Sequence, residues 1–113
     1  MVVAMPMDLD TFRKLVAMDD SDALSRFALG QALFQQGDSP EALNEAVEHL
    51  MFANTKDPNH LATYHILGQV LIKLGRKDEA RTVLGTGSTK AGNIGQGMGR
   101  DLGPAMTQLL DTL

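Results

Sequence analysis

The sequence predicts an all-α fold, in which antiparallel helix–turn–helix repeats stack into an α-α superhelix. Residues 27–43 return in large part over residues 65–83, and matching residues are offset by 38 positions throughout. A Leu-Gly-Gln motif at 29–31, for example, reappears at 67–69. Apolar residues recur every three or four positions in both copies, which is the period of a helix face. A constant offset across a helix, a turn and the start of a second helix indicates a repeated helical hairpin.

The composition fits one domain, residues 1–113, that is long enough to fold alone. Apolar residues make up 43% and aromatic residues only 4%, so we expect a core of leucine, alanine, valine and methionine. The lack of cysteine excludes disulfides and thiolate chemistry and agrees with a reducing compartment. The apolar tail Met1–Met7 lacks a basic leader, and no apolar run approaches the roughly 20 residues of a membrane span. We therefore expect a cytoplasmic protein with no membrane partner.

The charge is unevenly spread along the chain. Residues 1–60 hold four basic and ten acidic residues, for a net charge of −6, while residues 61–113 hold six and four, for a net charge of +2. An acidic first half disfavours nucleic acid as a partner, because that affinity depends on neutralising phosphates. The asymmetry fits solvated helix faces, and the alternative is that it steers head-to-tail association.

The first helix is expected over residues 8–18, after a short frayed tail. Asp8 or Asp10 supplies the N-cap, and Leu9, Phe12 and Val16 belong to one apolar stripe. An acidic turn follows at 19–22, one repeat offset before the turn at 57–60. We interpret this helix as the second half of an incomplete repeat, which covers the next unit as a terminal cap does.

The first full repeat is expected over residues 22–56. Ser21 or Asp22 caps its first helix, which apolar residues nearly encircle. Gly37 suits a left-handed C-cap, Asp38 or Ser39 supplies the next N-cap, and Pro40 fits the first turn of the second helix, where no N–H is needed. The second helix runs to about Asn54.

The second repeat is expected over residues 59–90. Asn59 caps its first helix, Gly75 stops that helix, and Asp78 caps the next. Six glycines between Gly85 and Gly99 make a continuing helix costly, at about 1 kcal/mol each relative to alanine, so we expect that helix to end between Gly85 and Gly92. Residues 85–99 are predicted to be a mobile loop.

A closing helix is expected over residues 100–113, opened by Asp101 or Pro104. Its apolar residues recur at helical spacing, which gives it one face to pack against the repeats: Leu102, Met106, Leu109, Leu110 and Leu113.

With these elements in place, the chain resembles the tetratricopeptide repeat (TPR) family, and in particular its small bacterial-type members. The resemblance covers residues 9–90 and rests on the Leu-Gly pair of each first helix, the turn glycine and the alanine of each second helix: Leu29, Gly30, Gly37 and Ala42, and then Leu67, Gly68, Gly75 and Ala80. Gly30 and Gly68 are expected to let the facing helix approach closely at Ala42 and Ala80. The offset between the repeats exceeds the usual length of the family's unit, and Arg26 stands where a large apolar residue is usual.

The resemblance implies about two TPR units between two capping helices, and a protein–protein interaction module. A partner segment would bind in a concave, partly apolar groove lined by the first helix of each pair. Carried over by position, the groove residues are Leu24, Phe27, Gln31, Phe34, Gln35, Ala62, His65, Gln69, Ile72 and Lys73. Phe27 and Phe34 are the expected anchors, unless they pack against the first or last helix instead. Few of these ten residues are cationic, which argues against a site that clamps the C-terminal carboxylate of a partner protein.

An alternative is a self-assembling structural module, with a homodimer formed through the repeat ends or by exchange of the closing helix.

Few residues of the sequence suggest a metal site or a catalytic site. His60 and His65 are poorly spaced for a shared metal ion, and His49 lies on another helix with no matched acidic residue. The stripe of Glu41, Glu45 and Glu48 is interpreted as a solvated face.

The stretch 85–90, Gly-Thr-Gly-Ser-Thr-Lys, lacks the Gly-Lys-Ser/Thr order and the preceding strand of a phosphate loop. We therefore expect no enzyme activity and no cofactor.

Overall fold

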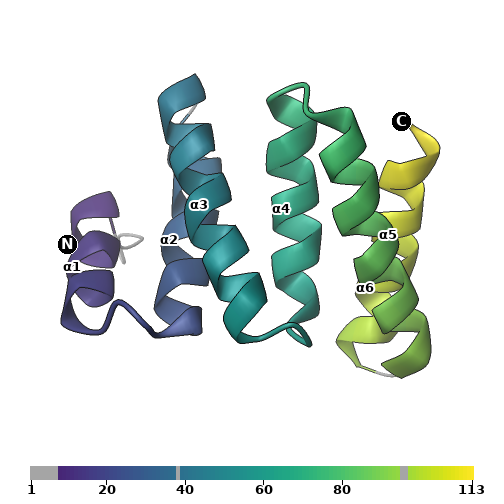
Figure 1. The fold of residues 1–113 in the computed structure, drawn as a ribbon, viewed down its shortest axis with the longest axis horizontal. Helices are drawn as coiled ribbons and strands as arrows, with labels where there is room; N and C mark the ends of the chain where they lie inside the picture. The colour runs from purple at the N-terminus through teal and green to yellow at the C-terminus, as the bar shows by residue number, and fades with distance from the viewer. Residues whose placement is uncertain (1–7, 38, 95–96) are drawn as a thin grey trace, which may run out of the picture.

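The computed structural model describes residues 8–37, 39–94 and 97–113, and the regular structure within these ranges is helical (Figure 1). The helices run alternately up and down beside one another, as the all-α repeat prediction requires. Their bounds are α1 Leu9–Met18, α2 Ala23–Gln36, α3 Pro40–Lys56, α4 Leu61–Lys73, α5 Lys77–Ile94 and α6 Met98–Asp111. The predicted tail 1–7, the cap option Asp38 and positions 95–96 of the predicted loop lie outside the described residues.

The helices pack in chain order, each against the next, from α1 to α6. In addition, α2 contacts α4 and α4 contacts α6, so the first helices of successive hairpins line up with one another. Helices α2/α3 and α4/α5 form two antiparallel hairpins, and α1 and α6 flank them (Figure 1).

Three helix starts carry the side-chain caps that the sequence predicts. Asp8 accepts a hydrogen bond from the Thr11 N–H at 2.9 Å, Asp22 from the Ser25 N–H at 3.3 Å, and Ser39 from the Ala42 N–H at 3.1 Å. Each bond satisfies one of the backbone donors left open at a helix start.

The predictions for the starts of α4 and α5 are wrong. His60, not Asn59, precedes α4, without a side-chain bond to the helix backbone. Asp78 lies inside α5, which begins at Lys77. At this hairpin the turn itself fixes the helix start, because the Arg76 N–H bonds back to the Leu71 carbonyl and the Ala80 N–H bonds to the Arg76 carbonyl.

The two turn glycines act for different reasons. Gly75 has a φ of +77° and ends α4 in the left-handed region, as predicted. Gly37 is extended, with a φ of −106°, so the left-handed prediction is wrong there. A Cβ at this position would lie 2.6 Å from the Ala42 Cβ, so the turn needs a glycine for space and not for its dihedral angles.

The prediction of a mobile loop over 85–99 is also wrong for the described part of that stretch. Helix α5 continues through three glycines to Ile94, and α6 already begins at Met98. A Cβ on Gly87 would lie 2.6 Å from both Tyr64 and Met106, and one on Gly99 would lie 2.8 Å from the Ala91 carbonyl. These glycines let α4, α5 and α6 approach closely, and that packing outweighs their low helix propensity.

Helix α6 likewise differs from its predicted start. It contains Pro104 in its interior instead of opening there, and Asp101 lies in its first turn. Pro104 is exposed, so the Arg100 carbonyl that loses its helical donor lies on the outer side of the fold.

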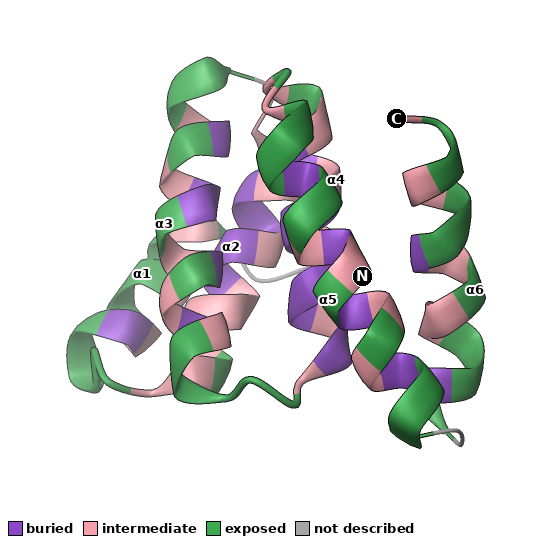
Figure 2. Cartoon of the chain, turned by 45° about the vertical axis from the view of Figure 1, so that its right-hand side comes forward, coloured by how far each residue is buried: buried purple, intermediate pink, exposed green. Residues whose placement is uncertain are grey.

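The core consists mainly of leucine, valine and alanine, with Tyr64 and Met106 near the last hairpin. Figure 2 shows the buried residues on the sides of the helices that face one another. Gly30 and Gly68 do permit close packing, but against leucines of the second helices and not against Ala42 and Ala80 as predicted. A Cβ on Gly30 would lie 2.6 Å from Leu50 Cγ, and one on Gly68 would overlap Leu84.

Within the described residues, no helix is both long and apolar enough to cross a bilayer.

Candidate functional site

The ten residues predicted to bind a partner lie on two neighbouring helices, five on α2 and five on α4, and we call this set the α2–α4 face. Its members fall into two groups by exposure. Leu24 is 64% exposed, which is high for a leucine, and Gln35 and Lys73 are also exposed. The other seven are half-buried: Phe27, Gln31, Phe34, Ala62, His65, Gln69 and Ile72.

Two cross-helix contacts join the α2–α4 face near its ends. The rings of Phe27 and His60 meet edge to face with their centroids 4.7 Å apart, and the Lys73 ammonium lies 5.5 Å from the centre of the Phe34 ring. Phe27, Phe34 and Ile72 also pack against the buried core. The two phenylalanines thus serve the core and the surface together, and truncating them would test stability as much as binding.

The middle of the face is polar. Gln69 donates from Nε2 to the His65 carbonyl at 3.3 Å, within its own helix. Burial lowers the pKa of His65, which keeps its imidazole neutral at pH 7. A neutral imidazole and the amides of Gln31 and Gln35 offer both donors and acceptors, as a peptide backbone requires.

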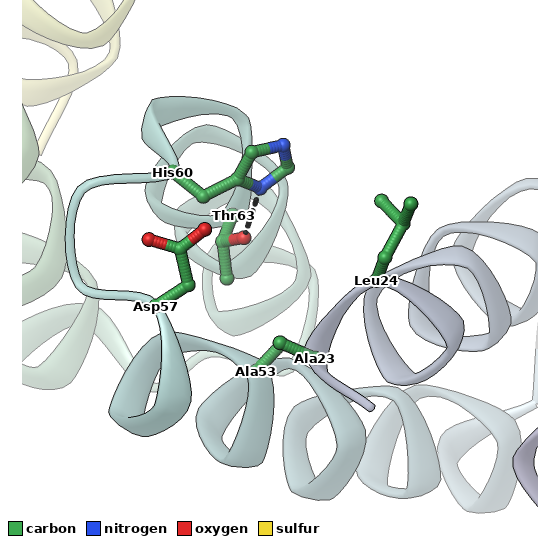
Figure 3. Close-up of a pocket in the computed structure, with 6 residues that line it drawn as sticks. All are labelled: Ala23, Leu24, Ala53, Asp57, His60 and Thr63. Atoms are coloured by element: carbon green, nitrogen blue, oxygen red, sulfur yellow. Dashed lines mark hydrogen bonds between the residues drawn. The ribbon is translucent and has the colours of Figure 1, made fainter. Parts of the chain in front are cut away.

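A small hollow opens at one end of the face, where the starts of α2 and α4 meet the end of α3 (Figure 3). It has a volume of about 30 Å³ and is lined by Ala23, Leu24, Ala53, Asp57, His60 and Thr63. Leu24 stands on one side of the hollow, and Asp57 stands on the other, beside His60 and Thr63. The hollow is far smaller than the roughly 300 Å³ of a typical ligand pocket, so it suits one side-chain group of a larger partner.

A second feature, which sequence reasoning missed, is a polar cluster across the first repeat. The Arg26 guanidinium lies 4.2 Å from the centre of the Phe52 ring, and its Nε donates to the Asp20 carbonyl at 2.9 Å. Its NH1 lies 3.3 Å from His49 Nδ1. The flat guanidinium therefore occupies the space of the large apolar residue that the resemblance leads one to expect.

The cluster continues from His49 to α1. His49 Nε2 lies 3.4 Å from a Glu45 carboxylate oxygen, and the same carboxylate accepts both terminal nitrogens of Arg13. Burial, assisted by the Arg26 charge, lowers the pKa of His49 against the opposing effect of Glu45, and the Arg13 hydrogen bond lowers the pKa of Glu45. The predictions that His49 has no matched acidic residue and that Glu45 belongs to a solvated stripe are wrong. Glu45 lies one turn before His49 on α3, a spacing that the sequence does show, whereas the contacts of this pair with Arg13 and Arg26 join different helices and leave no mark in the spacing.

The described residues contain neither a metal-binding cluster nor a phosphate-binding loop at the positions that the sequence suggested. Among the described residues, no three or more histidines, cysteines, aspartates or glutamates gather as a metal site would require. Residues 85–90 form a continuous part of α5 and not a phosphate-binding loop.

A family model matches the greater part of the chain. The family model described as "Anaphase-promoting complex, cyclosome, subunit 3", whose repeats are of the TPR type, matches residues 11–87, more than half of the chain. No curated protein matches the sequence.

Proposed function

The chain belongs to the family of the anaphase-promoting complex (cyclosome) subunit 3, and from this premise we propose that it binds a segment of a partner protein on the α2–α4 face. Repeats of this type generally mediate protein–protein contacts and are generally non-catalytic. In this proposal residues 1–113 act as one domain, and the site needs no cofactor.

The exposure of Leu24 is the observation that carries the proposal. Leu24 is 64% exposed and borders the hollow beside Phe27 and His60, so its apolar surface adjoins a recess and an aromatic pair. An apolar side chain of a partner that covered Leu24 would remove this surface from water, at roughly 25 cal/mol per Å² of apolar area buried. Few interface residues supply most of the binding energy, and apolar anchors next to a pocket are typical of them.

The chemistry of the face favours an apolar or amphipathic protein segment. Gln31, Gln35 and His65 can hydrogen-bond a partner backbone, while Lys73 is the only cationic member of the set, and its ammonium lies over Phe34. This arrangement does not favour a free carboxylate. The net negative charge of the chain does not favour nucleic acid.

Self-assembly through the repeat ends has less support. The exposed described residues of α6 are charged, polar or proline, and those of α1 are mostly charged: Asp10, Arg13 and Lys14, beside Ala17 and Met18. Polar outer faces are typical of capping helices and disfavour stacking of one copy on another. Light scattering at micromolar concentration separates the two functions, because the partner-binding proposal expects a monomer.

The proposal is tested by selecting binders from a displayed library of random short peptides. Peptides selected on the native protein should lose most of their affinity for Leu24→Asp. The matched control is Met51→Asp, which places the same charge at a methionine of α3 that is 50% exposed and lies outside the face. Equal loss in both variants, or in neither, contradicts the proposed site, and far-UV circular dichroism confirms that both variants fold.

A further inference from the structure

We propose that the hollow between Leu24 and Asp57 takes the side-chain ammonium of a lysine in the partner segment. This inference rests on the proposed function, which it sharpens by naming one residue of the partner. It is drawn from the charge, the apolar wall and the size of the hollow.

The charge comes from Asp57. Its Oδ1 accepts a hydrogen bond from the Asn59 N–H at 3.3 Å, and no Lys, Arg or His of the described chain forms an ion pair with its carboxylate. Asp57 is one of the residues that line the hollow, and Figure 3 shows its carboxylate beside Thr63. A carboxylate at the edge of a half-enclosed, partly apolar space favours a cation there, and a charge-assisted hydrogen bond is the strongest contact it can form.

The opposite wall suits the aliphatic part of a lysine. Leu24, Ala23 and Ala53 line the hollow, and their side chains are purely aliphatic. Lysine buries its four-carbon stem along apolar surface while its ammonium reaches a polar partner, so one side chain can cover the exposed Leu24 and pair with Asp57. An apolar partner residue would cover Leu24 but leave the Asp57 carboxylate without a counter-charge.

The polar wall is held in place. His60 Nδ1 lies 2.8 Å from the Thr63 hydroxyl, Thr63 is fully buried, and the edge-to-face contact with Phe27 fixes the other side of the His60 ring. A fixed wall keeps the hollow at its present size when a ligand enters.

That size distinguishes lysine from arginine. The hollow of about 30 Å³ has room for one or two groups of the size of a water molecule. An ammonium is such a group, whereas the planar guanidinium of arginine is larger. At the equivalent positions of the second repeat, Ala62 replaces Leu24 and Gly95 replaces Asp57, so the sequence provides this combination once.

The experiment uses peptides selected on the native protein, synthesised with acetylated N-termini so that lysine supplies the only amines. Each lysine is replaced in turn by norleucine or arginine, and affinity is measured by titration calorimetry. We expect one lysine whose replacement by norleucine weakens binding about twofold to fivefold, the range of an exposed ion pair. Arginine should be a poor substitute at that position.

The protein variants locate this lysine. In Asp57→Asn the amide oxygen can still accept from the Asn59 N–H, so the variant removes the charge alone, and the lysine and norleucine peptides should then bind equally. The control Asp20→Asn removes an exposed carboxylate outside the hollow and should retain the difference. Peptides that bind the α2–α4 face without any lysine dependence overturn this inference and leave the proposed function intact. If selected peptides are insensitive to Leu24→Asp, the proposed function itself is wrong.

Discussion

The two repeats share one backbone plan and differ in what joins their helices. Arg26 and Tyr64 occupy equivalent positions on the first helix of each pair. Tyr64 is 4% exposed and donates its hydroxyl to the Pro58 carbonyl at 2.7 Å. Arg26 is half-buried and lies over Phe52 while bonding His49 and Asp20. A buried aromatic ring and a stacked guanidinium thus fill the same site.

The residues facing these two positions differ accordingly. His49 faces Arg26, and its equivalent in the second repeat is Gly87, which leaves room for Tyr64 and Met106. The flanking helices α1 and α6 show the same contrast between polar and apolar contacts. An ion pair of Arg13 with Glu45 connects α1 to the first repeat, in addition to apolar contacts, whereas Met106 of α6 is fully buried against the second. A polar first repeat and an apolar second repeat should therefore respond differently to mutation, pH and salt.

The largest difference should appear when the two equivalent residues are truncated. Tyr64→Ala is expected to lower the free energy of unfolding by about 3–5 kcal/mol, as for other buried aromatic residues. Arg26→Ala should cost only about 1–2 kcal/mol, since its contacts are a cation–π pair and partly exposed hydrogen bonds. Urea unfolding of both variants tests this, and equal losses would contradict the proposed contrast.

The next effect concerns two glycines of α5. Gly87→Ala should lower the free energy of unfolding by about 1–2 kcal/mol, because the added methyl overlaps Tyr64 and Met106 by more than the gain in helix propensity offsets. Gly85→Ala is the matched control, since a Cβ there meets nothing within 4 Å, and it should stabilise the protein by about 0.5–1 kcal/mol. A stabilising Gly87→Ala would show that the close packing of α4, α5 and α6 is absent.

The polar cluster should make stability depend on pH near neutrality. The pKa of His49 is lowered in the folded state by burial and by Arg26, while Glu45 and Glu48 oppose the shift. The unfolded chain therefore takes up a proton first, so stability is constant above the unfolded pKa of about 6.5 and falls as the pH drops below it. His65 adds an effect of the same sign.

Urea unfolding at about pH 8 and about pH 5.5, on either side of the unfolded histidine pKa, measures this loss. The loss should be smaller in His49→Gln, which keeps a donor and an acceptor but cannot be protonated in this range. A variant that loses as much stability as the native protein between the two conditions would rule out His49 as the cause.

The smallest effect should come from the Arg13–Glu45 pair. Arg13 is largely exposed, so Arg13→Ala should cost no more than about 1 kcal/mol at low salt. The cost should shrink in about 1 M NaCl, where the screening length is about 3 Å. Arg81→Ala serves as the control for loss of an exposed cation, since it removes the ion pair with Asp78 on α5 together with a hydrogen bond to the Leu113 carbonyl.

Local rules predicted the helical hairpins well, because the helical spacing of apolar residues, the three caps and Gly75 act within a few residues. They failed at residues 85–99, where glycine propensity pointed to a loop. The decisive contacts there join Gly87 to Tyr64 and Met106, which are distant in sequence. The prediction for Gly37 was wrong for a different reason: the close approach of Ala42, a neighbour in the same turn, and not a backbone dihedral angle requires a glycine there.

The candidate site likewise contains residues that the sequence predicted and residues that only the structure reveals. The positions of Leu24, Phe27 and His65 on neighbouring helices followed from the resemblance, whereas the hollow depends on Asp57 and His60 from the turn between α3 and α4. Burial of Phe27 and Phe34 was left open by the sequence, because helical spacing alone does not separate a groove residue from a core residue.

The central claim is that a partner segment binds the α2–α4 face. The most direct test is to record amide chemical shifts of the isotopically labelled protein while a selected peptide is added. The largest shifts should fall on α2 and α4 around Leu24, Gln31 and His65, and on the turn at Asp57. Shifts concentrated instead on the exposed side of α5, at Thr82, Thr86 and Thr89, would contradict the claim.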